Sequence, residues 1–316
     1  MTIHRYITLY NSHIDTDIMP NHIEHVEDDI LTGFMPALDV LFNPKHISVK
    51  FDGIAVFWGT DPATNTFFVA NKSFYNKKKI RIAHSHEEID RFYDGEMADI
   101  LHACFKYLPR DQFDRHVFQG DFLGFGHGTK FKQNCIEYTF DEFVDQKVIM
   151  APHTLLYDFN RTDVLSQFVS YPLTRFFSDT SQVKWVQPCV DRPRSVSSAP
   201  KIDTSVVKFL REDEVTVCKR IINAFIRQGK PLHDALLTEI LGCPHLANLY
   251  QLVIECKEVA MDALIVSDAP QATLGGQPIK HEGFVFTDAG GYGFKVVDRE
   301  RFSAYNFMFG PHQNRS

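Results

Sequence analysis

The chain has 316 residues and a mass of 36.3 kDa, of which 44% are hydrophobic and 23% charged. This composition excludes a disordered or fibrous protein, and the length allows one large domain or two ordinary ones. The formal net charge of −7 argues against a generally basic nucleic-acid-binding surface, so any contact with a phosphate backbone must be local.

The sequence carries no sign of secretion or of a membrane span. The N-terminus has no apolar run long enough for a secretion signal, and nowhere does an apolar stretch reach the length of a transmembrane helix. The six cysteines are scattered, without a C-x-x-C pair, which favours reduced thiols over a zinc site. We therefore expect a cytoplasmic protein that does not engage a membrane.

The first half of the chain reads as antiparallel strands with one helical segment. Residues 49–71 predict a β-hairpin, because two β-rich runs flank a turn-forming stretch. Residues 87–107 predict a helix, and residues 117–122 and 148–157 predict strands. Between these strands we expect a glycine-broken loop at Gly124, Gly126 and Gly128.

A local basic patch follows the predicted hairpin. Five cations fall close together and are interleaved with Phe74 and Tyr75; they are Lys72, Lys77, Lys78, Lys79 and Arg81. The patch fits contact with nucleic acid, and equally a solvated hairpin edge that discourages sheet pairing.

The second half begins with a change in composition. Prolines and serines over residues 187–203 indicate a loop or linker. Helices are expected over residues 206–225 and 245–266, followed by short strands at 283–286 and 294–297. The pattern as a whole predicts an α+β fold built on antiparallel strand pairs.

The sharpest chemical signal is Lys50-Phe51-Asp52-Gly53, a lysine followed by a carboxylate and a glycine. Glycine lacks a Cβ and allows a close backbone approach. Alone, the tetrapeptide favours an exposed lysine and a turn glycine over a catalytic site.

Later segments complete a set in chain order. Lys50–Gly53 resembles the first motif of the covalent nucleotidyltransferases, which comprise DNA ligases, RNA ligases and mRNA capping enzymes. Residues 119–123 (QGDFL) are similar to their third motif and residues 148–157 to the strand that follows it. Residues 282–286 (EGFVF) and 294–297 (FKVV) are similar to the fourth and fifth motifs. The whole arrangement, including the tail DRERFSAYNF, resembles ligase-like proteins of large tailed phages, which implies a host cytoplasm for a phage-encoded chain.

The resemblance implies an antiparallel-sheet ligase adenylation domain with ATP and Mg²⁺ as cofactors. Lys50 would be the nucleophile, and its pKa must fall from about 10.4 before the amine can attack a phosphorus atom. Lys295 and a divalent metal would supply the positive charge that lowers this pKa. The same charges would stabilise the phosphate oxygens and the leaving pyrophosphate.

The resemblance also assigns roles to the remaining nucleotide-binding residues. Glu282 would hold the metal, with help from Asp52 or Asp121, since Mg²⁺ prefers carboxylate oxygens. Asp121 would mainly contact the ribose, and Gly53 would allow close approach of the nucleotide. Lys72, with Ser73, would contact the nucleotide or the end being joined. The alternative for each carboxylate and for Lys295 is an exposed charge on a strand.

Three departures from the family pattern stand out. Asp121 replaces the usual glutamate of the third motif and is one methylene shorter. Val297 occupies the place of the second lysine of the fifth motif. Residues 47–49 (ISV) lack the glutamate by which many ligases read adenine, so ATP is inferred from the family rather than from a base-reading residue.

The domain plan follows from the same comparison. Residues 1–40 would be an N-terminal extension and residues 41–316 the nucleotidyltransferase domain, with 187–280 a linker plus helical insertion. Too few residues follow Val297 for the C-terminal oligonucleotide-binding barrel of many relatives, so the domain would either work without it or borrow a protein partner in its place.

We therefore predict an ATP-dependent polynucleotide ligase that forms a lysyl-AMP intermediate and joins 5′-phosphate to 3′-hydroxyl ends. RNA is favoured over a nicked DNA duplex, by analogy with compact RNA repair ligases. The alternatives are a GTP-dependent capping-type guanylyltransferase and a catalytically silent member that binds nucleotide or nucleic acid.

Other candidates give weaker signals. His22 and His25, next to two glutamates, and the pair His84 and His86 lack a third ligand at diagnostic spacing. A role as helix-cap or surface histidines is therefore favoured over a role as metal ligands. Tyr157 or Phe159 could stack on a base, although an aromatic residue at a strand end is more often part of the core; the alternatives stay open in sequence.

Overall fold

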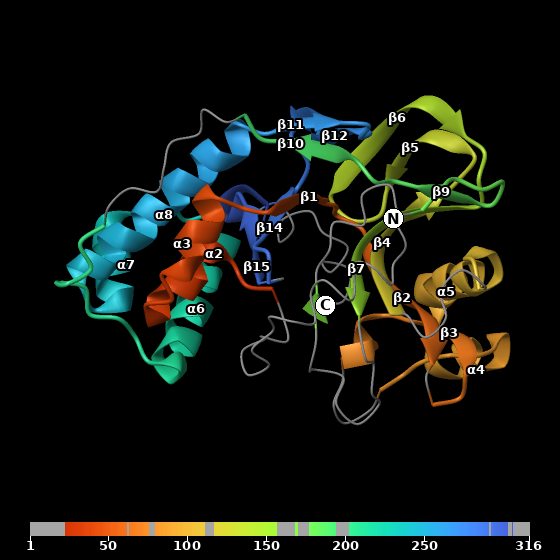
Figure 1. Cartoon of the computed structure of the whole chain (residues 1–316), viewed down its shortest axis with the longest axis horizontal. Helices are drawn as coiled ribbons and strands as arrows, with labels where there is room; N and C mark the ends of the chain where they lie inside the picture. The colour runs from red at the N-terminus through yellow and green to blue at the C-terminus, as the bar shows by residue number, and fades with distance from the viewer. Residues whose placement is uncertain are drawn as a thin grey trace.

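Helices and antiparallel strands combine in the α+β arrangement that the sequence predicts (Figure 1). The computed structural model describes residues 23–61, 63–75, 80–110, 117–156, 168–169, 177–193, 202–290, 292–302 and 305. The described chain separates into a sheet covered by two helices, a smaller central sheet, and a group of helices beyond it. A four-stranded sheet and a two-stranded sheet complete the described part of the chain.

The largest sheet has the strand order β3-β2-β4-β7-β8, with β9 parallel to β7. Its strands are β2 (Ile54–Asp61), β3 (Thr66–Ala70), β4 (Val117–Phe125), β7 (Val148–Leu156), β8 (Phe168–Val169) and β9 (Val183–Trp185). Both predicted strands are confirmed, and the predicted hairpin is confirmed from Ile54 onward, whereas residues 49 and 50 belong to a strand of another sheet. Residues 55–58 form a continuous buried run because both faces of β2 are covered.

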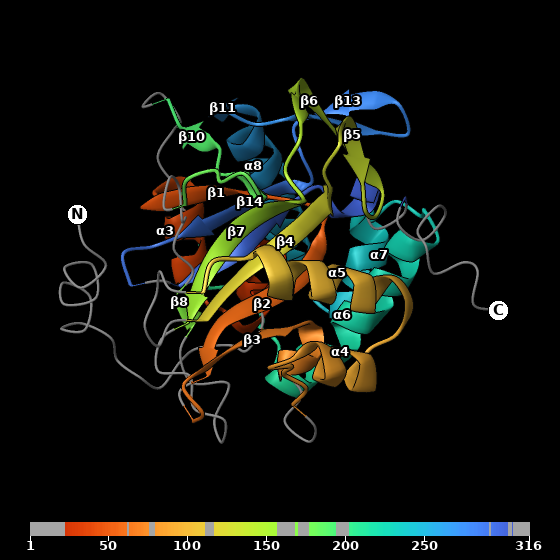
Figure 2. The same ribbon diagram turned by 90° about the vertical axis from the view of Figure 1, so that its right-hand side faces the viewer.

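Two helices pack on one face of this sheet (Figure 2). The helix predicted over residues 87–107 is divided into α4 (His86–Phe92) and α5 (Gly95–Tyr107). The break has a local cause, because Tyr93 and Asp94 both have extended backbone. The buried stripe of α5, which includes Leu101 and Phe105, packs in the same cluster as the inward residues of β2 and β4.

A three-stranded sheet lies between the large sheet and the helical group. It has the order β1-β14-β15, with β1 (His46–Lys50), β14 (Gly283–Thr287) and β15 (Gly293–Val297), all antiparallel. The predicted strands near residues 283 and 294 are confirmed. Their pairing with β1 joins segments from opposite ends of the chain.

The sequence did not predict the remaining strands. β5 (Gly128–Lys132), β6 (Ile136–Val144), β12 (Gln271–Leu274) and β13 (Gln277–Ile279) form a four-stranded sheet. β10 (Cys189–Asp191) pairs with β11 (Ile265–Ser267). The predicted glycine loop is wrong in extent, because Gly124 lies within β4 and Gly128 begins β5.

Helices from both halves of the chain pack together on the other side of the central sheet. They are α2 (Val26–Asp29), the 3₁₀ turn η1 (Ile30–Thr32), α3 (Pro36–Phe42), α6 (Glu212–Arg227), α7 (Asp234–Leu241) and α8 (Pro244–Asp262). The helix predicted from residue 206 begins later, at Glu212, because the N-cap Arg211 has an extended backbone and Leu210 N donates to Leu31 O instead of within a helix.

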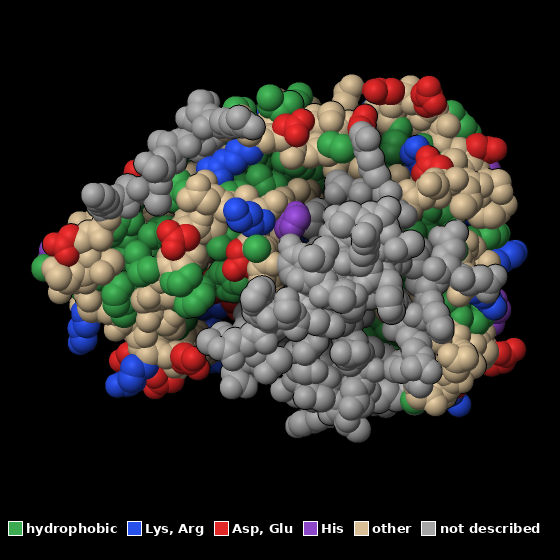
Figure 3. Space-filling model, in the orientation of Figure 1, with side chains coloured by type: hydrophobic (Ala, Val, Ile, Leu, Met, Phe, Trp, Pro, Cys, Tyr) green, Lys and Arg blue, Asp and Glu red, His purple; other side chains and the backbone are tan. Residues whose placement is uncertain are grey.

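The outer surface carries charges of both signs. In the part that Figure 3 colours, lysine and arginine side chains are interspersed with aspartate and glutamate. All six cysteines lie within the described ranges and are free thiols. Among the described residues, no helix is both long and apolar enough to cross a bilayer.

Candidate active site around Lys50

Lys50 and Glu282 meet although they are 232 positions apart in sequence. Lys50 is the last residue of β1, and its strand partner is Gly283, the first residue of β14. Glu282 therefore lies directly beside that pair, and Lys50 Nζ forms an ion pair with Glu282 Oε2. The antiparallel register of β1 and β14 creates this contact.

Lys295 lies on the same sheet, one strand further across. It pairs with Val285 on β14, two residues along from the Gly283 that faces Lys50. Residues two apart along a strand share a face, so Lys50 and Lys295 lie on the same side of the sheet. Val297, in the place of a second lysine, is buried and packs against Gly283.

Gly53 brings the loop between β1 and β2 against the large sheet. A Cβ atom at this position would lie 2.7 Å from the Cβ of Asp121 and 2.7 Å from the carbonyl oxygen of Phe122. A side chain would clash there with β4, so only glycine fits at this position. The loop between β1 and β2 thereby places Lys50 and Asp121 in one electrostatic cluster.

The carboxylate of Asp52 is occupied by protein donors. Cys135 N and Ile136 N donate to Asp52 Oδ2 over 2.8 and 3.0 Å, and Asn134 Nδ2 donates to Oδ1 over 3.3 Å. The backbone N of Asp52 donates to the hydroxyl of Tyr138 over 2.6 Å. Asp52 therefore fastens the β1–β2 loop to the β5–β6 turn, and its oxygens point toward that turn.

Two cationic or basic side chains approach Asp121 from the large sheet. Lys72 begins the 3₁₀ helix η2 (Lys72–Tyr75) after β3, is exposed, and its charge acts on Asp121 and Lys295. His153 on β7 has its Nε2 3.7 Å from Asp121 Oδ2 and its Nδ1 2.7 Å from the hydroxyl of Thr154. Ser73 contacts the Tyr93 hydroxyl.

Sequence reasoning missed His153. A single histidine in an apolar strand gives no local signal, and a β-bulge between Gln119 and Gly120 shifts its register against Asp121. Only the pairing of β4 with β7 brings the two side chains together.

The charges around Lys50 favour its protonated form. Burial alone would lower the pKa of Lys50, but Glu282, Asp121 and Asp52 outweigh burial and raise the pKa above its ordinary value. The prediction counts a bound divalent metal among the charges that lower this pKa, whereas the protein side chains alone raise it. The cause is an excess of nearby carboxylates over nearby cations.

Burial is the largest influence on the pKa of each other member of the cluster. Burial, followed by repulsion from Lys50, lowers the pKa of Lys295 to about 8. Burial raises the pKa of Asp121 to about 6, partly opposed by Lys50 and Lys72. Burial and then repulsion from Lys50 lower the pKa of His153 to about 4, so this ring is neutral at pH 7. Burial raises the pKa of Glu282.

Several weaker candidates now have definite surroundings. His84 lies between Asp61 and Glu88, with Nε2 2.9 Å from Asp61 Oδ2 and Nδ1 3.1 Å from Glu88 Oε2, while His86 contacts His102. Within the described ranges, no three His, Cys, Asp or Glu side chains are grouped to hold a metal ion.

Other predicted residues fall elsewhere. Arg81 donates to the carbonyl of Phe92 and so anchors the chain before α4. The structure describes neither His22, the run 77–79, Tyr157 nor Phe159. The basic patch and the base-stacking candidates therefore stay predictions.

The comparison with protein families places the chain. It belongs to the family described as "Family of unknown function (DUF6267)", which matches residues 20–241 and 242–310. No curated protein and no solved structure matches the chain significantly. The family description assigns no activity, so the function is argued from the site.

Proposed function

We propose that the chain is a covalent nucleotidyltransferase of the ATP-dependent polynucleotide ligase type, with Lys50 as the nucleophile. The observation that carries this proposal is the convergence of Lys50, Glu282 and Asp121 from three distant segments. A lysine amine beside two carboxylates, with a second lysine on the same sheet face, is a suitable arrangement for attack on a nucleoside triphosphate.

The proposed reaction has three steps. The neutral amine of Lys50 attacks the α-phosphorus of ATP, an N–P bond forms, pyrophosphate leaves, and the amine proton passes to solvent. The 5′-phosphate of a polynucleotide then attacks this phosphorus, a P–O–P bond forms, the N–P bond breaks, and the leaving amine of Lys50 takes up a proton from solvent. A 3′-hydroxyl finally attacks the 5′-phosphorus and displaces AMP. RNA is the preferred polynucleotide, with a nicked DNA duplex as the other ligase substrate.

The donor set fits a magnesium ion. Mg²⁺ takes one or two carboxylates and completes its shell with water and substrate phosphates, so a group of three protein ligands is not required. Glu282 and Asp121 would hold the ion, because the oxygens of Asp52 already accept backbone and amide hydrogen bonds. When bound, the ion supplies positive charge that offsets the carboxylates and favours the neutral amine.

Three further side chains would assist the reaction. Lys295 faces the same side as Lys50, holds positive charge near the phosphate and disfavours protonation of the nucleophile. Lys72 adds charge from the exposed side. Asp121, held near His153, would contact the ribose.

A second candidate function is nucleotide or nucleic-acid binding without covalent chemistry. The raised pKa of Lys50 and the valine at position 297 favour this candidate. It keeps the same carboxylates and lysines but uses them only as contacts.

One experiment separates these functions. The protein is incubated with α-labelled ATP or GTP and Mg²⁺, then analysed on a denaturing gel. Acid-labile label retained from ATP supports the ligase proposal, and label from GTP alone supports a capping-type guanylyltransferase. No label from either nucleotide, together with saturable nucleotide binding, supports the silent candidate and overturns the covalent one.

A further inference from the structure

A cavity lies among the helices beside the end of β15, and none of the candidate active-site residues lines it. Its volume is about 370 Å³. Small-molecule sites span about 300–1,000 Å³, whereas one water occupies about 30 Å³. The cavity is therefore large enough for an organic ligand.

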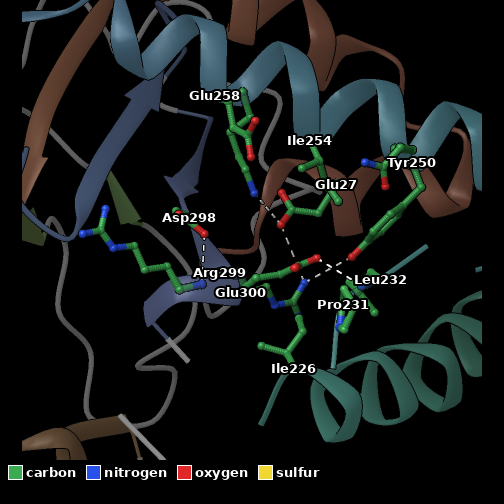
Figure 4. Close-up of a pocket in the computed structure, with 13 residues that line it drawn as sticks. Glu27, Ile226, Pro231, Leu232, Tyr250, Ile254, Glu258, Asp298, Arg299 and Glu300 are labelled. Carbon is green, nitrogen blue, oxygen red and sulfur yellow. Dashed lines mark hydrogen bonds and ion pairs between the residues drawn. The ribbon is translucent and has the colours of Figure 1, made fainter. Parts of the chain in front are cut away.

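Charged side chains line one side of the cavity, and two of its cations already form ion pairs with carboxylates of the protein (Figure 4). Lys257 Nζ donates to Glu27 Oε1 over 2.8 Å, and Arg299 Nη1 donates to Asp28 Oδ1 over 2.9 Å. Arg299 Nη2 donates to Asn223 Oδ1 over 2.8 Å. An anionic ligand would have to compete with these carboxylates for each cation.

Two acceptors of the cavity wall remain unsatisfied within the described part of the chain. Glu27 is only 1% exposed, yet its Oε2 has no hydrogen-bond partner, and Oε1 of Gln251 on α8 has none either. Both residues line the cavity. Buried acceptors without donors are unfavourable, so these oxygens point to a ligand that donates hydrogen bonds.

The mouth of the cavity adds negative charge. Glu258, Asp298 and Glu300 line it together with one further cation, Arg301. Burial and then repulsion from Asp298 raise the pKa of Glu258, and Glu300 adds to that repulsion. A bound cation would relieve this crowding of carboxylates.

The remaining wall is apolar. Ile226, Leu232 and Ile254 line it, with Pro231 beside them. A fully hydrated metal ion gains nothing from such a wall, whereas a short hydrocarbon chain would lose its contact with water there.

We propose that this cavity binds an alkylammonium ion, whose N–H groups donate to Glu27 and Gln251 and whose hydrocarbon lies against the apolar wall. The ligand is either a free polyamine or a lysine side chain, since both present this chemistry. This cavity shares no residue with the candidate active site, so diamine binding does not depend on nucleotidyl transfer.

Calorimetric titration of the full chain with butane-1,4-diamine tests it. Butane-1,4-diol, which has the same length and no charge, is the matched ligand control. We expect saturable binding of the diamine, weakened by added salt, and at least about tenfold weaker binding of the diol. Absence of saturable diamine binding, or equal binding of the diol, would overturn the proposal.

Variants locate the site. The double variant Glu258→Gln with Asp298→Asn should weaken diamine binding about tenfold. Glu255→Gln removes one charge from an exposed position of the same helix that does not line the cavity, and should leave binding unchanged. An equal loss of diamine binding in Glu255→Gln would overturn the assignment of the site to this cavity. The salt and diol comparisons use the unmodified protein, so they hold even if a variant fails to fold.

A second ligand distinguishes the two sources. Nα-acetyl-lysine methylamide carries one ammonium on a peptide-like group. If it binds as tightly as the diamine, the site recognises a lysine side chain, and if only the diamine binds, it recognises a free polyamine.

Discussion

Replacing Glu282 by glutamine should lower the pKa of Lys50. The carboxylate of Glu282 is in direct contact with the amine, and the two side chains are 14% and 26% exposed. Two unit charges about 4 Å apart interact by about 4 kcal/mol at an effective dielectric constant near 20. One pKa unit corresponds to about 1.36 kcal/mol, so even a third of that interaction shifts the pKa by about one unit.

The sign follows from the charge that is removed. Glu282 stabilises the protonated amine, so its loss favours the neutral amine at lower pH. The assay is the pH profile of acylation of Lys50, followed by mass spectrometry without nucleotide or metal, because only the neutral amine reacts. The profile of Glu282→Gln should move to lower pH by at least about one unit.

An exposed ion pair provides the matched control. Lys130 Nζ and Glu137 Oε1 are 3.3 Å apart, but their side chains are 62% and 39% exposed. Solvent screens such pairs strongly, so Glu137→Gln should move the acylation profile of Lys130 far less. A Lys50 profile that stays in place in Glu282→Gln would refute the account of how the carboxylates set its protonation.

Three further predictions concern the proposed reaction. Lys50→Ala should abolish covalent labelling while the circular dichroism spectrum is retained; wild-type labelling would exclude Lys50 as the nucleophile. Glu282→Ala and Asp121→Ala should each slow single-turnover adenylation by about a hundredfold or more, and near-normal rates in both would contradict their roles. Lys295→Ala should slow adenylation and move its pH profile upward, because less repulsion leaves Lys50 protonated to higher pH, whereas Lys295→Arg should be intermediate; an unchanged rate would make Lys295 only a strand lysine.

The strands that carry the proposed motifs were predictable because each has a strong local pattern. β2, β4 and β7 are apolar runs, and β14 and β15 flank a glycine-rich turn. The four-stranded edge sheet was not predictable in the same way. β6 (Ile136–Val144) mixes charged, polar and aromatic residues without a strict period of two, and its partner β12 lies far away in sequence, so no local pattern reports the pairing.

The sequence predicted most of the residues that form the candidate site. It did not predict how their charges shift the pKa of Lys50. Chain order suggested that Lys50, Asp121 and Glu282 share a site, but the pKa of Lys50 depends on how many carboxylates surround it in space. The helix boundary at Glu212 was missed for a related reason: a tertiary hydrogen bond from Leu210 to Leu31 overrides the local apolar periodicity.

Asp52 illustrates how a motif residue can serve the fold. The resemblance assigns it to the nucleotide, whereas its carboxylate accepts hydrogen bonds from Asn134, Cys135 and Ile136. Asp52→Ala would leave two buried backbone N–H groups without partners, and hydrogen bonds to a charged acceptor contribute about 1.5–3 kcal/mol each. We therefore expect the free energy of unfolding in urea to fall by about 2–4 kcal/mol, with a smaller loss in Asp52→Asn, which keeps one acceptor oxygen. An Asp52→Ala protein of wild-type stability that binds nucleotide poorly would instead assign Asp52 to the ligand, because a clamp between the Lys50 loop and the β5–β6 turn cannot be removed without cost to the fold.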